Sequence, residues 1–194
     1  MKTSSVIVLW LCSITVTMAQ DSFEIDTSQS LLKWKGSNLF KFNEHFGTAK
    51  FSSGQILMEN DSISGGNFKV DMNTIINTDD KYNEMLVRHL KNEDFFDVKK
   101  HPSAYLEIKE VNYIDENQVQ INANLTIKSI TNPIVYNSAV ERQKGKVIMT
   151  AKFIIDRTLW NVNYESKSLL NSLKDDTISD AIEFEAMVIT DQKK

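Results

Sequence analysis

An alternation of apolar and polar residues with a period of two dominates the chain and predicts β-strands. In the clearest run, residues 119–127, every odd position is apolar and every even position is polar. Every second position is also apolar in residues 68–72, 147–155 and 182–188. Successive strand side chains point to opposite faces, so each run predicts a strand with one buried face and one wet face. Such strands are typical of antiparallel sheets.

Short turn signals separate the predicted strands. The predicted hairpin connections are Ser52-Ser53-Gly54, Gly65-Gly66, Asp115-Glu116-Asn117 and Lys144-Gly145. Many strands with short turns indicate either a closed up-and-down barrel or a sandwich, and the pattern alone does not choose between them. Closure would remove the edge strands that invite aggregation.

One segment, residues 86–102, departs from the strand pattern. Leu86 and Leu90 lie four positions apart, which places them on one face of a helix. Phe95 and Phe96 follow a polar break, and Pro102 stops any helix before a new extended run. The segment fits a lid over a β structure, but the residue types alone favour a helix that packs into a corner of the core.

The first residues predict a cleaved signal peptide, residues 1–19. Lys2 supplies the positive charge, residues 6–16 are apolar, and Ala19 ends a small-residue cleavage site. The apolar run is too short to span a bilayer comfortably, so no stable membrane insertion is expected. We therefore expect an exported protein, periplasmic or secreted.

The expected mature chain, residues 20–194, shows neither a repeat nor a linker and is read as a single domain. The only cysteine, Cys12, lies in the predicted signal peptide, so a disulfide or thiolate site is not expected in the mature chain. Removing Lys2 leaves 21 basic against 26 acidic residues, which changes the net charge from −4 to −5. This acidic balance disfavours nucleic acid as a partner.

Signatures of catalysis are scarce. The three histidines, His45, His89 and His101, lack the spacing of a zinc site. The sequence has neither a Gly-x-Ser-x-Gly elbow nor a phosphate loop, and its paired carboxylates occupy polar, loop-like stretches. We therefore predict no enzyme, no catalytic residue, no metal and no cofactor.

Apolar residues are the more informative material. Ten phenylalanines and three tryptophans are enough either to fill a barrel or to line one. The residue types leave these two alternatives open.

Several motifs, taken in order, resemble the YceI-like domain family. The central ones are His89-Leu90, Asp94-Phe95-Phe96-Asp97 and His101-Pro102. Phe23-Glu24-Ile25-Asp26 and Leu32-Lys33-Trp34-Lys35-Gly36 resemble the opening strands of the family, and His45-Phe46-Gly47 resembles its His-x-Gly turn. The later matches are Asn124-Leu125-Thr126-Ile127-Lys128, Thr131-Asn132-Pro133, Ile155-Asp156-Arg157-Thr158 with Trp160, and Ile178-Ser179-Asp180. The resemblance runs from about Phe23 to about Ile189.

Two residues depart from the family pattern. Ser129 stands where the family usually has glycine, and Asn161 stands where glycine often follows the aromatic residue. We interpret both as small backbone adjustments, because Asn tolerates left-handed geometry better than most residues.

The resemblance implies a fold and a ligand. The fold is an all-β, lipocalin-like antiparallel up-and-down β-barrel of about eight strands, with one or two short helices at its mouth. The ligand is a long isoprenoid, either a polyprenyl chain or an isoprenoid quinone, which the protein carries or stores. Burial of each CH₂ contributes about 0.8 kcal/mol, so a long chain needs few polar contacts. The expected ligand-binding residues are Trp34, Phe40, Phe42, Phe46, Phe51, Phe68, Met72, Leu86, Leu90, Phe95, Phe96, Phe153 and Trp160.

Two other functions stay open at this stage. A filled barrel would act through protein contacts in the cell envelope. An enzyme would act on the lipid head group through His45 or His89. The oligomeric state is also open, with a homodimer among the options.

Overall fold

The computed structural model describes residues 21–41, 43–79, 84–166 and 177–191, so the predicted signal peptide lies outside the described residues. Its elements are β1 (Asp21–Glu24), β2 (Leu31–Ser37), β3 (Glu44–Glu59), β4 (Ser62–Asn77), α1 (Glu84–Lys91), β5 (Ser103–Tyr113), β6 (Gln118–Ile127), β7 (Ile130–Gln143), β8 (Lys146–Asp156), the 3-10 helix η1 (Arg157–Trp160) and β9 (Ala181–Ile189). In this described part of the chain, no helix has both the length and the apolar character needed to cross a bilayer.

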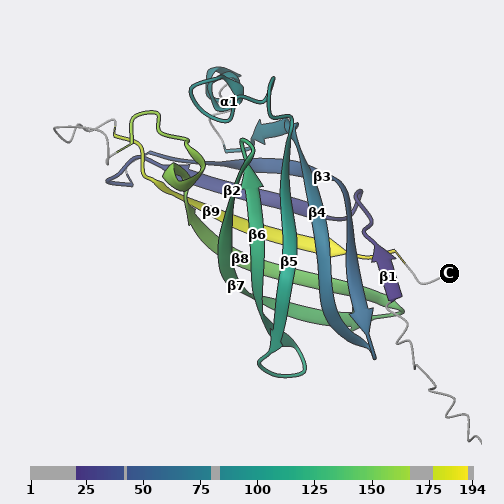
Figure 1. The fold of residues 1–194 in the computed structure, drawn as a ribbon. Helices are drawn as coiled ribbons and strands as arrows, with labels where there is room; N and C mark the ends of the chain where they lie inside the picture. The colour runs from purple at the N-terminus through teal and green to yellow at the C-terminus, as the bar shows by residue number, and fades with distance from the viewer. Residues whose placement is uncertain (1–20, 42, 80–83, 167–176, 192–194) are drawn as a thin grey trace, which may run out of the picture.

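Strands β2 to β9 form a closed antiparallel barrel (Figure 1). Each strand pairs with the next one along the chain, and β9 returns to pair with β2. The short strand β1 adds to the outer edge of β3, where Asp21 pairs with Met58 and Glu24 pairs with Gln55. The closed eight-stranded barrel confirms the predicted fold and decides between the barrel and the sandwich.

The period-two pattern has the expected structural consequence. In β6, the odd residues from Val119 to Ile127 are all buried. In β8, Val147, Met149, Ala151 and Ile155 are buried and Lys152 is exposed. Apolar side chains therefore point into the barrel interior, because the pleat sends every second side chain inward.

Two of the four predicted turns are correct. The segment 115–117 joins β5 to β6, and Lys144-Gly145 joins β7 to β8. The other two predictions are wrong, because Ser52-Ser53-Gly54 lies within β3 and Gly65-Gly66 lies within β4. The actual connection between β3 and β4 is Asn60-Asp61, whose φ angles are 50° and 61°. Two successive positive φ angles are typical of the type I′ hairpin turn, and they suit Asn and Asp.

Two of the three glycines in the mispredicted turns lie where β3 and β4 approach each other closely. A Cβ on Gly54 would lie 2.7 Å from the Phe68 ring, and a Cβ on Gly66 would lie 2.7 Å from the Gln55 carbonyl oxygen. Glycine inside a strand often marks a site where another backbone or side chain comes close. These glycines therefore allow β3 and β4 to pair tightly over their length.

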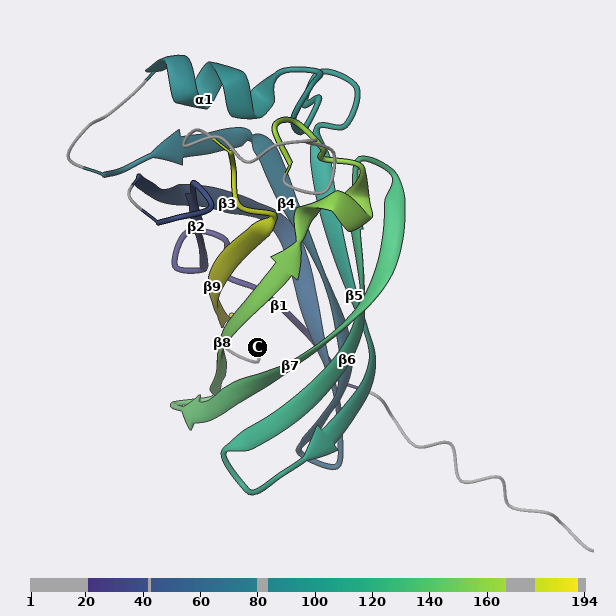
Figure 2. The same ribbon diagram turned by 90° about the vertical axis from the view of Figure 1, so that its left-hand side faces the viewer.

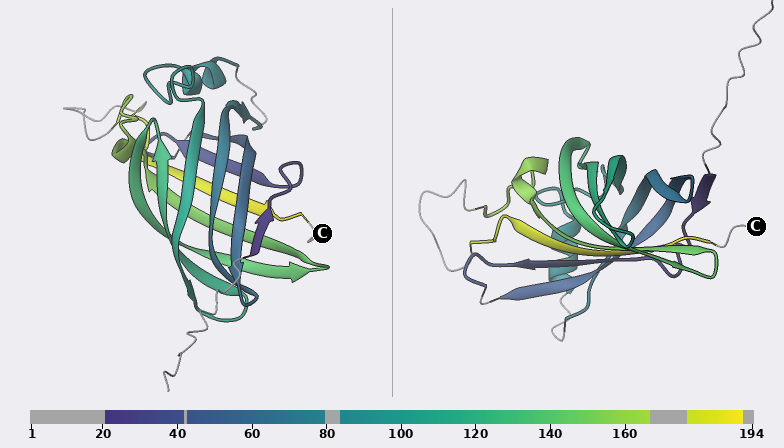
Figure 3. Two further views of the ribbon diagram at one scale, coloured as in Figure 1. Left: turned by 45° about the vertical axis from the view of Figure 1, so that its right-hand side comes forward. Right: turned by 90° about the horizontal axis from the view of Figure 1, so that it is seen from below.

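The two ends of the barrel differ. At the end that carries the β5–β6 turn, the barrel interior is closely packed. Four side chains of the hydrophobic core there are 0 % exposed: Ile56, Val119, Ile121 and Val140. The opposite end is covered by α1 and the loop that follows it (Figures 2 and 3). We call the first region the packed end. It shows that part of the barrel is filled with side chains.

The wall between β7 and β8 is completed by η1 near the α1 end. The two strands pair from Ser138 to Gln143 and from Lys146 to Ala151. Beyond that stretch, the Asn132 side chain donates a hydrogen bond to the Leu159 carbonyl at 2.8 Å, and the Trp160 indole donates one to the Leu125 carbonyl at 2.9 Å. Pro133 lies in β7 where its missing N–H is tolerated, because that residue pairs only with β6 in the described ladder.

Candidate functional site

A cavity of about 350 Å³ lies inside the barrel between α1 and the packed end. All eight barrel strands contribute to its walls, together with α1. Its volume falls within the range of small-molecule sites, which is roughly 300–1,000 Å³. The barrel is therefore filled at one end and hollow at the other.

One wall of the cavity carries a row of aromatic side chains in register. Trp34 on β2 pairs with Phe184 on β9, and Phe184 pairs with Phe153 on β8. Phe153 then stacks on Tyr136 of β7, with the ring centroids 4.9 Å apart. We call Trp34, Phe184, Phe153 and Tyr136 the aromatic row. It gives a ligand a continuous apolar surface across four strands.

Gly47 fixes the position of the Trp34 ring. The two residues are partners in the β2–β3 ladder. A Cβ on Gly47 would lie 2.7 Å from the indole ring and 1.9 Å from the Ile76 carbonyl oxygen. Any side chain at position 47 would therefore displace the ring or the backbone of β4. The motif His45-Phe46-Gly47, likened to a turn on sequence grounds, lies at the beginning of β3.

The roof of the cavity is formed by α1 and the paired phenylalanines. Leu86 and Leu90 of α1 line the cavity, as do Phe95 and Phe96. The two phenylalanine rings meet edge to face at 4.9 Å, and both are buried. The segment thus lies over the cavity end of the barrel, and its Leu90, Phe95 and Phe96 side chains also belong to the buried core.

The loop after α1 is held by backbone hydrogen bonds and one ion pair. The N–H of Phe96 donates to the Leu90 carbonyl at 3.2 Å, and the N–H of Asp97 donates to the Asn92 carbonyl at 2.7 Å. Lys100 lies 3.0 Å from the Asp97 carboxylate, and its hydrogen bond lowers the pKa of Asp97. These contacts fix the two phenylalanines against the cavity.

Polar groups gather where the cavity meets the lid. The His45 Nδ1 lies 2.8 Å from the Asp79 carboxylate, which also accepts a hydrogen bond from the Asn77 side chain at 2.7 Å. His89 on α1 lies edge to face with Tyr164 at 4.4 Å. Its Nδ1 is 3.9 Å from the Asp94 carboxylate. Each of these histidines therefore has a carboxylate beside it.

Arg157 is a buried cation beside the cavity. Its guanidinium donates hydrogen bonds to the carbonyls of Ser179, Val162 and Ile178 at 3.0, 2.6 and 3.3 Å. It also lies 3.5 Å from the Asp180 carboxylate and over the Phe95 ring. Burial lowers the pKa of Arg157. The guanidinium thus ties η1 and the segment before β9 to the lid.

Most of the predicted ligand-binding residues lie on the cavity walls. These are Trp34, Phe51, Phe68, Met72, Leu86, Leu90, Phe95, Phe96 and Phe153. Phe40 and Phe46 lie elsewhere, with 45 % and 47 % of their surface exposed. Trp160 is buried behind the wall, where its hydrogen bond to Leu125 fixes η1. Phe42 lies outside the described residues.

Sequence reasoning missed two members of the aromatic row, Phe184 and Tyr136. Phe184 occupies an inward position of the alternating run 182–188, so the pattern contained the signal. No such signal marked Tyr136, because tyrosine occurs both inside and outside proteins and its presence does not predict which way the side chain points. Burial raises the pKa of the Tyr136 hydroxyl, which stays protonated. Among the described residues, no group of His, Cys, Asp and Glu could hold a metal ion.

The comparisons with known proteins agree with this architecture. The model of the YceI-like domain family matches residues 23–189. A search of curated protein sequences finds no match. Among solved structures, BcnA of Burkholderia cenocepacia is similar, with a TM-score of 0.70 and 17% identity over 85% of this chain and 98% of that chain.

Two further structures share the fold. A polyisoprenoid binding domain from Saccharophagus degradans has a TM-score of 0.64 and 12% identity over 91% of this chain and 100% of that one. A YceI protein of Campylobacter jejuni has a TM-score of 0.54 and 19% identity, over 68% of this chain and 75% of that one. At these identities the likeness shows the fold.

Proposed function

Because the chain belongs to the YceI-like domain family, we propose that it binds a long isoprenoid lipid, a polyprenyl chain or an isoprenoid quinone, in the hollow end of its barrel. The observation that carries the proposal is the cavity itself, which is lined by the aromatic row and roofed by α1. A solved neighbour is described as a polyisoprenoid binding domain, which favours the same class of ligand. We further propose that the protein is exported and acts as a carrier or a store.

The physical basis of binding is burial of apolar surface. The opposite wall supplies Phe51 and Phe68, whose rings meet edge to face at 6.2 Å. Each ligand CH₂ that leaves water contributes about 0.8 kcal/mol, so a few isoprene units are sufficient for stable binding. Such a lipid is nearly insoluble alone, and a covered cavity keeps it from water.

Mass spectrometry of an organic extract of the purified protein tests the proposal. An isoprenoid in near-stoichiometric amount is the supporting result. A matched variant, Ala151→Trp, places a large ring on the cavity wall and should lower the bound lipid. A lipid-free protein that also fails to bind an added isoprenoid would favour the filled-barrel alternative.

A head-group enzyme is the second candidate, and the contact between His45 and Asp79 favours it. A carboxylate that accepts from Nδ1 orients a histidine for proton transfer at Nε2. Conversion of an added isoprenoid ester by the wild type, lost in His45→Ala while lipid binding persists, would support this candidate. We propose the binding role, in which His45→Ala leaves the lipid chemically unchanged.

A further inference from the structure

Three polar groups at the cavity have no hydrogen-bond partner among the described residues. The Trp34 Nε1 and the His89 Nε2 are buried and unpaired. The Tyr136 hydroxyl, on the same cavity wall as Trp34, makes no hydrogen bond in the described part of the chain. A buried donor that lacks a partner is costly, so these groups are suited to meet an oxygen atom of a ligand.

The cavity offers a ligand anion little positive charge. Arg157 is the one arginine or lysine among the described residues that line it. Its guanidinium already donates to three backbone carbonyls and lies beside Asp180. It is therefore committed to holding the backbone and has little capacity left for a ligand anion.

One carboxylate lines the cavity, and two more lie beside histidines that line it. Glu165 lines the cavity, and its charge is the main cause of the raised pKa of Tyr164. The Asp79 carboxylate lies 2.8 Å from His45 Nδ1, and the Asp94 carboxylate lies 3.9 Å from His89 Nδ1. A ligand head group that reaches this part of the cavity therefore meets Glu165 and two histidines that each have a carboxylate beside them.

We propose that this cavity selects isoprenoids by the charge of the head group: it accepts an uncharged head group that bears oxygen and rejects a phosphorylated one. The inference rests on the proposed function, because it assumes that an isoprenoid chain occupies the cavity. An oxygen of a hydroxyl or carbonyl head group accepts a hydrogen bond from Trp34 or from Tyr136, which lie at opposite ends of the aromatic row. A diphosphate would lose its water here without gaining an available cation.

Two ligands of equal chain length separate the head-group effect from the chain. The probes are geranylgeraniol and geranylgeranyl diphosphate, which share one isoprenoid chain and differ in the head group. Competition dialysis against the purified, delipidated protein, with mass spectrometry of the bound fraction, measures both affinities. The expected result is tighter binding of the alcohol by about two- to tenfold, since one hydrogen bond to a buried donor contributes an effect of that size.

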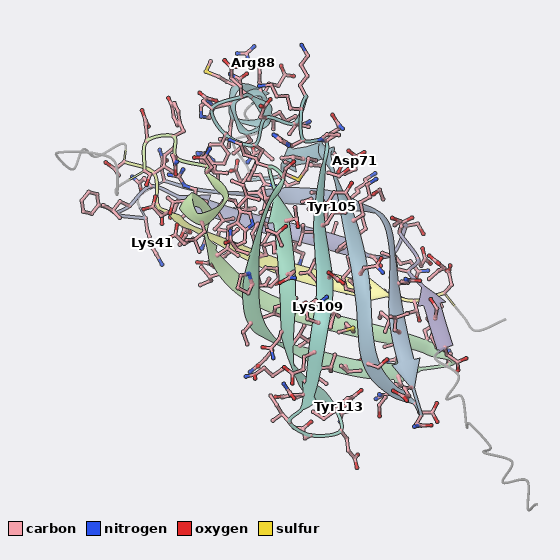
Figure 4. The ribbon with its side chains drawn as sticks, viewed as in Figure 1. Lys41, Asp71, Arg88, Tyr105, Lys109 and Tyr113 are labelled. Carbon is pink, nitrogen blue, oxygen red and sulfur yellow. The ribbon has the colours of Figure 1, made fainter. Side chains whose placement is uncertain are left out.

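Matched variants locate the effect. Trp34→Phe and Tyr136→Phe each keep an aromatic ring and remove the donor. The variant that lacks the donor used by the ligand should bind the alcohol about two- to tenfold more weakly. Tyr113→Phe is the control, because Tyr113 lies at the packed end, far from α1 (Figure 4), and lines no part of the cavity. Glu165→Lys should strengthen diphosphate binding and thereby reduce the preference of the protein for the alcohol over the diphosphate.

Each outcome has a clear meaning. Diphosphate binding that equals or exceeds alcohol binding would overturn the head-group inference and leave the proposed function standing. Failure of both ligands to bind would overturn the proposed function, and the inference with it. A preference for the alcohol that persists unchanged in both Trp34→Phe and Tyr136→Phe would also overturn the assigned donors.

Discussion

Left-handed backbone at single residues shapes the turns of this barrel. Ser129 and Asn161 have φ angles of 62° and 57°, and both stand where glycine is usual in the family. Both residues therefore adopt the left-handed geometry that glycine favours. Ser129 also contacts His101 Nδ1 at 3.0 Å through its hydroxyl, so its side chain has a partner that glycine would lack.

Substitution of Ser129 separates backbone strain from that side-chain contact. Ser129→Ala removes the hydroxyl and keeps the Cβ, whereas Ser129→Gly removes both. The glycine variant should be more stable than the alanine variant by about 1 kcal/mol, because glycine adopts positive φ without steric cost. Urea unfolding of the two variants measures the difference. Equal stability would mean that the turn relaxes in the alanine variant.

Phe153 and Lys152 are neighbours with opposite environments. Phe153 lies between Tyr136 and Phe184 on the cavity wall. The side chain of Lys152 is 75 % exposed and lies 3.0 Å from Glu185. Phe153→Arg should cost several kcal/mol if the cation stays inside, since an unpaired charge is then buried.

Lys152→Ala is the matched control for that change. Loss of an exposed ion pair should alter the unfolding free energy by no more than about 0.5 kcal/mol. Chemical denaturation of both variants gives the comparison. A small effect at Phe153 would indicate that the arginine escapes through the cavity mouth to water.

At the scale of the element, the period-two pattern was sufficient to predict most of the strands. Residues 119–127 and 147–155 predicted strands and their inward faces correctly, because one side of each strand is buried. The turns were harder. Gly54 and Gly66 looked like turn residues, but each serves close strand contact. Asn60-Asp61, the real turn, carries a weaker signal because neither residue is glycine.

The candidate site was predictable only in part. Aromatic type alone led to Phe51, which lines the cavity, and also to Phe40, which is exposed, whereas the alternating pattern also supported Phe68 and Phe153. The difference depends on the direction of each side chain from its strand. The aromatic row depends on the register between β2, β9 and β8, and a single sequence does not reveal register.

η1 depends on Arg157 for its attachment to the rest of the molecule. Arg157→Lys keeps the charge, but an ammonium cannot reach all three carbonyls that the planar guanidinium serves. We expect a loss of about 2–4 kcal/mol, because buried carbonyls lose their donors. Arg142→Lys is the control: Arg142 donates to the Asp61 carbonyl near the surface, and its replacement should cost under about 0.5 kcal/mol. Thermal or urea unfolding that shows equal losses would refute the anchoring role.

At the scale of the whole molecule, surface ion pairs set the response to pH. Hydrogen bonds from Ser28, Lys100 and Lys33 lower the pKa values of Asp26, Asp97 and Glu185, respectively. Hydrogen bonds to Glu44 and Asp97 raise the pKa values of Lys35 and Lys100. The carboxylates thus favour the folded state above their ordinary pKa values, and the lysines favour it below theirs.

These shifts predict a plateau of stability with losses at both ends. Stability from the carboxylates is lost as the pH falls through their lowered pKa values, below the ordinary values of 3.8 for Asp and 4.5 for Glu. Stability from the lysines is lost as the pH rises through their raised pKa values, above 10.5. Urea midpoints from pH 3 to pH 11 measure the profile. Glu185→Gln should flatten the acid side, and an unchanged acid side would contradict the assignment.

The division of the barrel into a packed end and a hollow end makes the last prediction. Phe96 roofs the cavity, so Phe96→Ala should reduce lipid retention strongly. Its cost in unfolding free energy should stay below the roughly 3–5 kcal/mol of a fully enclosed phenylalanine, because one side of the ring already faces the cavity.

Ile121→Ala provides the contrast, because Ile121 is 0 % exposed in the packed end. It should cost about 2–5 kcal/mol and leave the amount of lipid per folded molecule unchanged. Both variants are compared in two measurements. Urea unfolding gives the loss of stability, and mass spectrometry gives the amount of bound lipid. If Phe96→Ala lost full stability while the wild type carried no lipid, the roof would be part of a solid core, and the carrier proposal would fail. If the two variants instead separate as expected, stability belongs to the packed end and ligand retention to the hollow one.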